Sequence, residues 1–112
     1  MPFITIYLMC FNEEVLLPFT VEYYKKQFPS STIVVCDNES TDSSLSLAKS
    51  LGCEVYSFST GGVFSEEALT KVRNTIWKTA KSEWVLVGDM DELLCLNEKT
   101  LKEEGSKGVT IL

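Results

Sequence analysis

The chain has 112 residues, 45% of them hydrophobic, with 10 basic and 16 acidic side chains and a formal net charge of −6. This size and composition suit one domain with a full hydrophobic core, so we expect residues 1–112 to form a single domain. An acidic chain without a basic stripe is poorly suited to nucleic acid or anionic membranes. No apolar run approaches the ~20 residues that span a bilayer. Because the first basic residue is Lys25, the start also lacks the charged segment of a signal peptide, which predicts a cytoplasmic protein.

The sequence contains four cysteines and no histidine. The cysteines lack CxxC spacing, and no histidine is present to complete a zinc site with them. Cys10 and Cys36 fall in apolar segments, where free thiols behave as small hydrophobic groups; a disulfide between them is the minor alternative. Without histidine, Ser-His-Asp and Cys-His nucleophiles are excluded. Any chemistry must therefore use carboxylates, Arg or Lys, hydroxyls or a metal.

The first half of the chain alternates between apolar strands and amphipathic helices. β-branched and aromatic residues predict strands at 3–11 and 31–36. Asn12, followed by two glutamates, is predicted to cap a helix that runs to residue 28. A second helix is expected to open at residues 40–42 and to end at Gly52. The residues expected to face the core in the two helices are Leu17, Val21, Tyr24, Phe28, Leu45, Ala48 and Leu51.

The second half continues the same alternation. The predicted strands are 53–58, 83–88 and 108–112. Ser65 is the predicted N-cap of a helix over 65–81, and Phe64 and Leu69 stand at the positions of a hydrophobic staple. Asn97 is the predicted N-cap of a short last helix that ends at Gly105. Leu96 and Leu101 occupy its staple positions.

Strands that are apolar on both sides and alternate with amphipathic helices predict a three-layer α/β/α fold with a mainly parallel sheet. In such folds, ligands bind beyond the carboxyl ends of the strands, where the strand order reverses. The strand ends to inspect are therefore residues 10–14, 36–42, 59–65 and 88–92.

Carboxylates follow the first, second and fourth predicted strands, and those after the fourth are the most informative. Asp89 and Asp91 are two residues apart, about 6.6 Å in an extended chain. At an effective dielectric of 20, the two charges repel by roughly 2.5 kcal/mol. Mg²⁺ or Mn²⁺, which prefers oxygen ligands, would turn this repulsion into attraction. A solvated acidic turn is the alternative, and ordinary turn and capping roles are the alternative for the other clusters.

The remaining strand-end loop and the helix after it are less specific. Gly61 and Gly62 allow close approach of backbone to a ligand, but no Lys follows them in the Walker pattern. The helix over 65–81 carries Lys71, Arg73, Lys78 and Lys81. A solvated basic face explains the lysines as well as a binding role does.

Four segments in order give the sequence a family resemblance. "FNEE" follows the first strand, "VVCDNESTD" spans the end of the second, "VRN" lies in the third helix and "DMDELL" follows the fourth strand. Together they resemble a GT-A glycosyltransferase of the family 2 type, over residues 3 to about 94. The resemblance implies the Rossmann-like, nucleotide-binding half of a GT-A domain. It further implies sugar transfer from a UDP- or GDP-linked donor to an unknown acceptor, with Mn²⁺ or Mg²⁺ as cofactor.

The resemblance also assigns residues. Asp91 is implied as the direct metal ligand, with Asp89 near the metal and the ribose, while Asp37 is implied to hydrogen-bond the base or ribose. The implied nucleotide-binding residues are Phe11, Asn12, Glu13, Asp37, Asn38, Arg73 and Asp89. Glu39 departs from the family, which usually has glycine at that position.

The chain is about half as long as a full GT-A domain, so we expect the acceptor half, with its catalytic base, to be missing. A non-catalytic or truncated nucleotide-sugar-binding module therefore stays open as an alternative. A haloacid dehalogenase type of phosphatase is disfavoured because only 20 residues (112 minus 92) follow Glu92. A receiver-like signalling domain is disfavoured because no phosphorylatable Asp follows the third strand.

Overall fold

The computed structural model describes residues 3–59, 66–95, 97–104 and 108–111. Strands and helices alternate along these ranges, as the sequence predicts. The elements are β1 (Ile4–Cys10), α1 (Leu17–Gln27), β2 (Ser31–Asp37), α2 (Ser44–Ser50), β3 (Glu54–Ser57), α3 (Glu66–Ile76), a 3-10 turn (Trp77–Thr79), β4 (Trp84–Asp89), α4 (Glu98–Glu104) and β5 (Gly108–Ile111).

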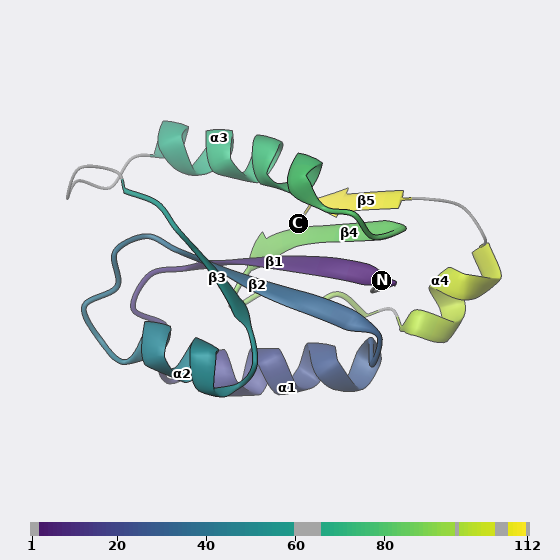
Figure 1. Ribbon diagram of the computed structural model, residues 1–112, viewed down its shortest axis with the longest axis horizontal. Helices are drawn as coiled ribbons and strands as arrows, with labels where there is room; N and C mark the ends of the chain where they lie inside the picture. Colours follow the sequence, from purple (N-terminus) through teal and green to yellow (C-terminus); the bar gives the residue numbers. More distant parts are fainter. Residues whose placement is uncertain (1–2, 60–65, 96, 105–107, 112) are drawn as a thin grey trace.

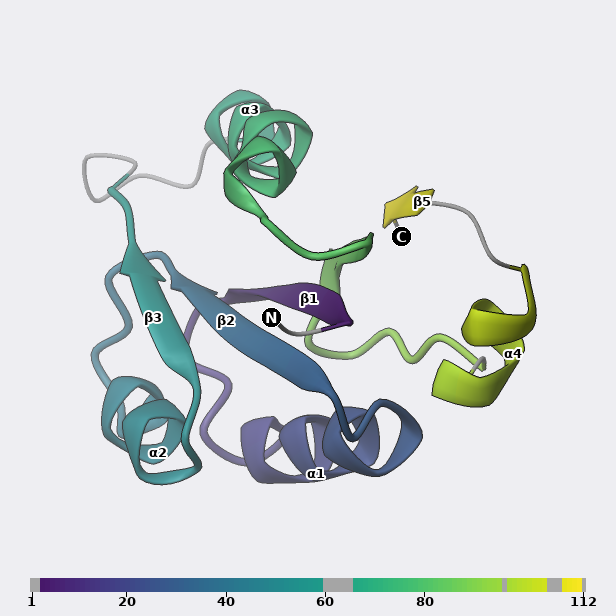
Figure 2. The same ribbon diagram turned by 45° about the vertical axis from the view of Figure 1, so that its right-hand side comes forward.

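The five strands form one parallel sheet in the order β3-β2-β1-β4-β5 (Figure 1). The chain builds outward from β1 to β3 and then returns to place β4 on the other side of β1. The strand order therefore reverses between β1 and β4, where α/β folds of this type bind ligands. Helices α1 and α2 cover one face of the sheet and α3 covers the other (Figure 2). The predicted three-layer α/β fold is confirmed.

The core has two parts, one on each face of the sheet. All seven residues of β1 are buried, as its apolar sequence predicts. Alternate residues point to opposite faces: Ile6 and Leu8 pack on the side of α1, and Tyr7 and Met9 pack on the side of α3. The central strand is therefore held from both sides. The carboxyl end of β1, which leads into the first of the acidic loops, is therefore fixed in position.

Helix α1 has the predicted buried face but begins later than predicted. Leu17, Val21, Tyr24 and Phe28 are each at most 1% exposed. The helix starts at Leu17, and Pro18 lies in its first turn, where a missing N–H is tolerated. The prediction that Asn12 caps this helix is wrong.

Helix α2 also starts later than predicted, at Ser44 instead of residues 40–42. Its end is as predicted, because Gly52 has a φ of +82°, which suits glycine. The Gly52 N–H donates to the Lys49 carbonyl (3.1 Å), and the Cys53 N–H donates to the Ala48 carbonyl (3.0 Å). These two bonds form a Schellman motif.

The third predicted helix and the third predicted strand are both shorter than expected. Ser65 and Phe64 lie outside the described residues, and the helix over 65–81 is observed as α3 followed by the 3-10 turn. β3 is an edge strand with Glu54 and Tyr56 exposed, so the expectation of strands apolar on both sides fails there.

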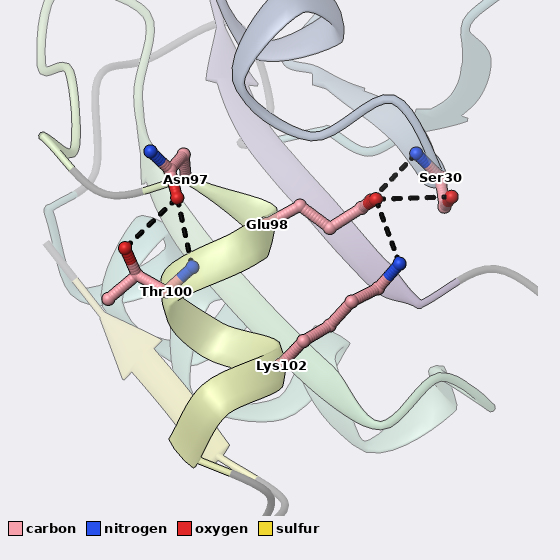
Figure 3. A network of polar contacts seen from close by, with 5 residues as sticks. All are labelled: Ser30, Asn97, Glu98, Thr100 and Lys102. Carbon is pink, nitrogen blue, oxygen red and sulfur yellow. Dashed lines mark hydrogen bonds and ion pairs between the residues drawn. The ribbon is translucent and has the colours of Figure 1, made fainter.

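Helix α4 is capped as predicted and is tied to the amino end of the sheet (Figure 3). Asn97 Oδ1 accepts hydrogen bonds from the Thr100 N–H (2.9 Å) and hydroxyl (3.0 Å). The Glu98 carboxylate accepts a bond from the Ser30 N–H (2.8 Å) and forms an ion pair with Lys102 (3.2 Å). α4 is therefore anchored to the turn between α1 and β2. Leu96 and Gly105, which the sequence places at its ends, lie outside the described residues.

The four cysteines are free thiols. Cys10, Cys36 and Cys53 are buried and Cys95 is exposed. Burial raises the pKa of the Cys36 thiol to about 12, so this thiol stays protonated and unreactive. The prediction of free, buried thiols at positions 10 and 36 is confirmed.

Candidate functional site

Three loops meet beyond the carboxyl ends of β1, β2 and β4. The first two are joined where their strands end, since the Asn38 N–H donates to the Cys10 carbonyl at 2.9 Å. β1 lies between β2 and β4 in the sheet, so the third loop emerges on its other side. This places the predicted site residues after β1, β2 and β4 along one edge of the sheet.

Asn12 connects the first loop to the second instead of capping a helix. Its amide oxygen accepts hydrogen bonds from the N–H groups of Thr41 (2.7 Å) and Asp42 (3.3 Å). Its own N–H donates to Ser40 Oγ at 2.9 Å. Asn12 has a φ of +50°, a left-handed conformation that asparagine adopts more readily than most residues.

Asp37 lies at the end of β2 and is only 3% exposed. Its carboxylate accepts two hydrogen bonds from Ser40, one from the N–H (3.1 Å) and one from the hydroxyl (2.5 Å). Asp37 therefore fixes the turn that follows β2. Direct contact between Asp37 and a base or ribose stays a prediction.

The glutamates after β1 extend the same network. The Glu13 N–H donates to Ser44 Oγ (2.9 Å), and the Glu14 N–H donates to an Asp42 carboxylate oxygen (3.2 Å). The Glu14 carboxylate accepts in return from the Ser43 N–H at 3.0 Å. The start of α2 is thus held by residues of the β1 loop.

Glu13 also faces the loop after β4. Burial raises the pKa of the Glu13 carboxyl above its ordinary 4.5, and repulsion by Asp91 and Asp42 raises it further. Glu13 and Asp91, which belong to the first and third loops, therefore repel each other.

Glu39 adopts a left-handed conformation, with a φ of +53°. This conformation favours glycine, which is the residue that the resemblance leads us to expect at this position, and costs other residues about 1–2 kcal/mol. Glu39 therefore adds strain to the turn after β2.

The acidic cluster after β4 consists of Asp89, Asp91 and Glu92. One carboxylate oxygen from each lies within 4.8 Å of the other two. Asp91 and Glu92 are exposed, and the Asp89 side chain is 39% exposed. The donors are hard oxygens and are accessible from outside, as Mg²⁺ and Mn²⁺ require. Three convergent carboxylate donors fit such a cation.

Arg73 of α3 forms an ion pair with Asp89. The structure therefore brings together two residues that the sequence places sixteen positions apart and that the resemblance assigns to the nucleotide. The Arg73 side chain as a whole is 25% exposed. Guanidinium groups suit phosphate oxygens because of their planar set of donors.

Helix α1 holds the acidic loop through side-chain hydroxyls. Thr20 Oγ1 donates to the Met90 carbonyl at 2.7 Å, and the Tyr23 hydroxyl donates to the Leu94 carbonyl at 2.8 Å. No functional role was predicted for these residues from the sequence. Hydroxyl-bearing residues on the apolar side of a predicted helix are the signal that could have identified them.

Tyr24 makes the most central of these contacts. Its hydroxyl donates to the Glu92 carbonyl at 3.0 Å and accepts from the Leu94 N–H at 3.1 Å. Its side chain is fully buried, and burial raises the pKa of the hydroxyl. The hydroxyl therefore stays neutral and can both donate and accept a hydrogen bond. From its spacing in the sequence, Tyr24 was expected only to face the core.

Phe11, which the resemblance places at the nucleotide, is exposed, with 57% of its surface accessible. It lies directly after β1, next to Asn12. An exposed aromatic ring at a strand end is available to stack on a base or ribose. This contact also stays a prediction.

The topology defines a Rossmann-like α/β protein, and the three loops form a candidate site at the switch between β1 and β4. The family model for glycosyl transferase family 2 matches residues 5–95. The chain belongs to this family. No curated protein and no solved structure gave a match. Among the helices described, none has the length and apolar character needed to cross a membrane.

Proposed function

We propose that the chain binds a nucleoside-diphosphate sugar, UDP- or GDP-linked, through a divalent cation at Asp89 and Asp91, and serves sugar transfer to an acceptor. Membership of glycosyl transferase family 2 supports sugar transfer in general. The observation that carries the donor site is the convergence of three carboxylate donors within 4.8 Å at the end of β4. We further propose that residues 1–112 form one domain and that it works in the cytoplasm.

The local charge supports a cation of charge +2. Asp89, Asp91 and Glu92 contribute −3 and Arg73 contributes +1, so these four residues carry −2, and the nearby Glu13 adds further negative charge. Asp91 and Asp89 would hold Mn²⁺ or Mg²⁺, with open positions for phosphate oxygens. When bound, the cation supplies a Lewis acid that stabilises the diphosphate leaving group.

The residues of the chain would divide the remaining tasks. Arg73 would orient the diphosphate, and its bond to Asp89 would keep both side chains in place. Phe11 would contact the nucleoside from the exposed side of the β1 loop. Asn12 and Asn38 would shape the nucleoside site, since their hydrogen bonds join the first two loops. Asp37 would contribute by fixing the turn after β2 through its bonds from Ser40.

A binding experiment tests the proposal. UDP and GDP are titrated into the protein by calorimetry, with Mn²⁺ and with EDTA. We expect binding that depends on Mn²⁺ and that Asp91→Asn abolishes. Glu83→Gln is the matched control, because it removes one exposed negative charge next to the opposite end of β4 and should leave binding unchanged.

A panel of nucleotide sugars tested for metal-dependent hydrolysis separates an enzyme from the alternative, a non-catalytic nucleotide-sugar-binding module. Turnover lost in Asp91→Asn supports the enzyme. Binding without turnover favours the binding module. If no nucleoside diphosphate binds, with or without Mn²⁺, the proposed donor site is wrong both for the enzyme and for the binding module.

A further inference from the structure

The acidic loop lacks regular secondary structure after Asp89, where Asp91 and Glu92 carry two of its three carboxylates. β4 ends at Asp89, and residues 90–95 belong to no helix or strand. A turn bond from the Glu92 N–H to the Asp89 carbonyl spans 3.2 Å and curls the chain back on itself. The positions of Asp91 and Glu92 must therefore be fixed by contacts from elsewhere in the fold.

Those contacts come from one face of α1 and lie on both sides of Asp91. Thr20 bonds the carbonyl of Met90, which precedes Asp91, and Tyr24 bonds the carbonyl of Glu92, which follows it. Thr20 is 2% exposed and Tyr24 is fully buried, so water does not compete for either hydroxyl. Asp91 is thus the exposed tip of a turn whose flanks are bonded to the buried face of α1.

We propose that Thr20 and Tyr24 are positioning residues for the metal-binding loop, and that the affinity for the cation depends on their hydroxyls. This inference rests on the proposed function. Groups that orient metal ligands without touching the metal typically change affinity ~10-fold to 100-fold when mutated. A site must also be held within about 0.5 Å to bind well. Two hydroxyl anchors next to Asp91 would supply that constraint.

The chain offers matched controls for both residues. Tyr7 is a buried tyrosine whose hydroxyl bonds Thr79 at 3.0 Å on the α3 side of the sheet. Thr5 is a buried threonine bonded to Ser82 at 2.7 Å. Loss of either hydroxyl removes a hydrogen bond of a buried side chain, and neither bond involves the acidic loop. Tyr7→Phe and Thr5→Val should therefore lower stability as Tyr24→Phe and Thr20→Val do.

The test measures Mn²⁺ affinity by following free Mn²⁺ with electron paramagnetic resonance. We expect Tyr24→Phe and Thr20→Val each to weaken Mn²⁺ binding about tenfold, while Tyr7→Phe and Thr5→Val bind as the unmodified protein does. Thr20→Val keeps the shape of the side chain, so this variant still tests the proposal if Tyr24→Phe folds poorly.

The two possible failures are distinguishable. If the unmodified protein binds Mn²⁺ and the α1 variants bind it equally well, the positioning role is wrong and the proposed function stands. If all four variants weaken binding alike, general destabilisation explains the loss and the inference is also overturned. If the unmodified protein binds no Mn²⁺, the proposed function and the inference both fail.

Discussion

Replacing Asp91 with asparagine is expected to change the stability of the protein in opposite directions with and without a divalent cation. Without metal, the substitution removes a charge within 4.8 Å of two other carboxylates. Two unit charges at that distance repel by about 0.9 kcal/mol in water. Screening at physiological ionic strength reduces this to about 0.5 kcal/mol. Because Asp89 is already paired with Arg73, the repulsion relieved is chiefly that with Glu92.

The metal reverses the order of stability. At a Mn²⁺ concentration of ~100 times the dissociation constant, binding stabilises the unmodified protein by about 2.7 kcal/mol. The asparagine variant lacks the direct metal ligand, so Mn²⁺ should add little to its stability. Asp91→Asn should therefore be about 0.5 kcal/mol more stable than the unmodified protein in EDTA and about 2 kcal/mol less stable in Mn²⁺.

Urea denaturation in EDTA and in Mn²⁺ measures both differences. Glu83→Gln, the charge-matched control, should behave in both conditions like the unmodified protein. If Asp91→Asn shows the same stability difference with and without Mn²⁺, the acidic cluster is not the metal site. If it is less stable in EDTA, the carboxylates do not repel each other as inferred.

Three further predictions follow from individual residues. Glu39→Gly should raise the free energy of unfolding by about 1 kcal/mol because glycine relieves the left-handed backbone, and a loss of stability in urea would contradict this. Burial and repulsion raise the pKa of the Glu13 carboxyl, so its charged form destabilises the folded protein. Glu13→Gln should therefore be more stable than the unmodified protein at neutral pH. The difference should vanish as the pH falls below 4.5, where Glu13 is protonated in both the folded and the unfolded protein. An advantage that grows in acid would refute this assignment. A thiol reagent should label exposed Cys95 in the native protein and reach Cys36 only after unfolding, as mass spectrometry can show; rapid native labelling of Cys36 would contradict its burial.

The sheet and its order of elements were predictable because burial leaves a simple pattern. A strand buried on both faces reads as a continuous apolar run, and β1 is buried at every residue. The convergence of acidic loops followed from the same pattern, since parallel strands deliver their carboxyl ends to one edge. The start of α1 was misplaced because asparagine favours both helix caps and left-handed loops. Local sequence does not decide between these roles for Asn12.

The contacts made by α1 were not predictable for a different reason. The spacing of Tyr24 in the sequence indicates a core position, and Tyr24 is indeed fully buried. That spacing does not reveal what the hydroxyl meets, because Glu92 and Leu94 are distant in sequence and approach only when β4 pairs with β1. The ion pair between Arg73 and Asp89 is likewise set by how α3 lies over the sheet.

A crystal of the protein grown with Mn²⁺ and UDP would locate the cation through the anomalous scattering of manganese. We expect an anomalous peak bonded to the Asp91 carboxylate, close to Asp89, with diphosphate oxygens completing the coordination. If UDP is bound but manganese is absent from the end of β4, with the carboxylates of Asp89 and Asp91 turned to solvent, the proposed metal site is wrong.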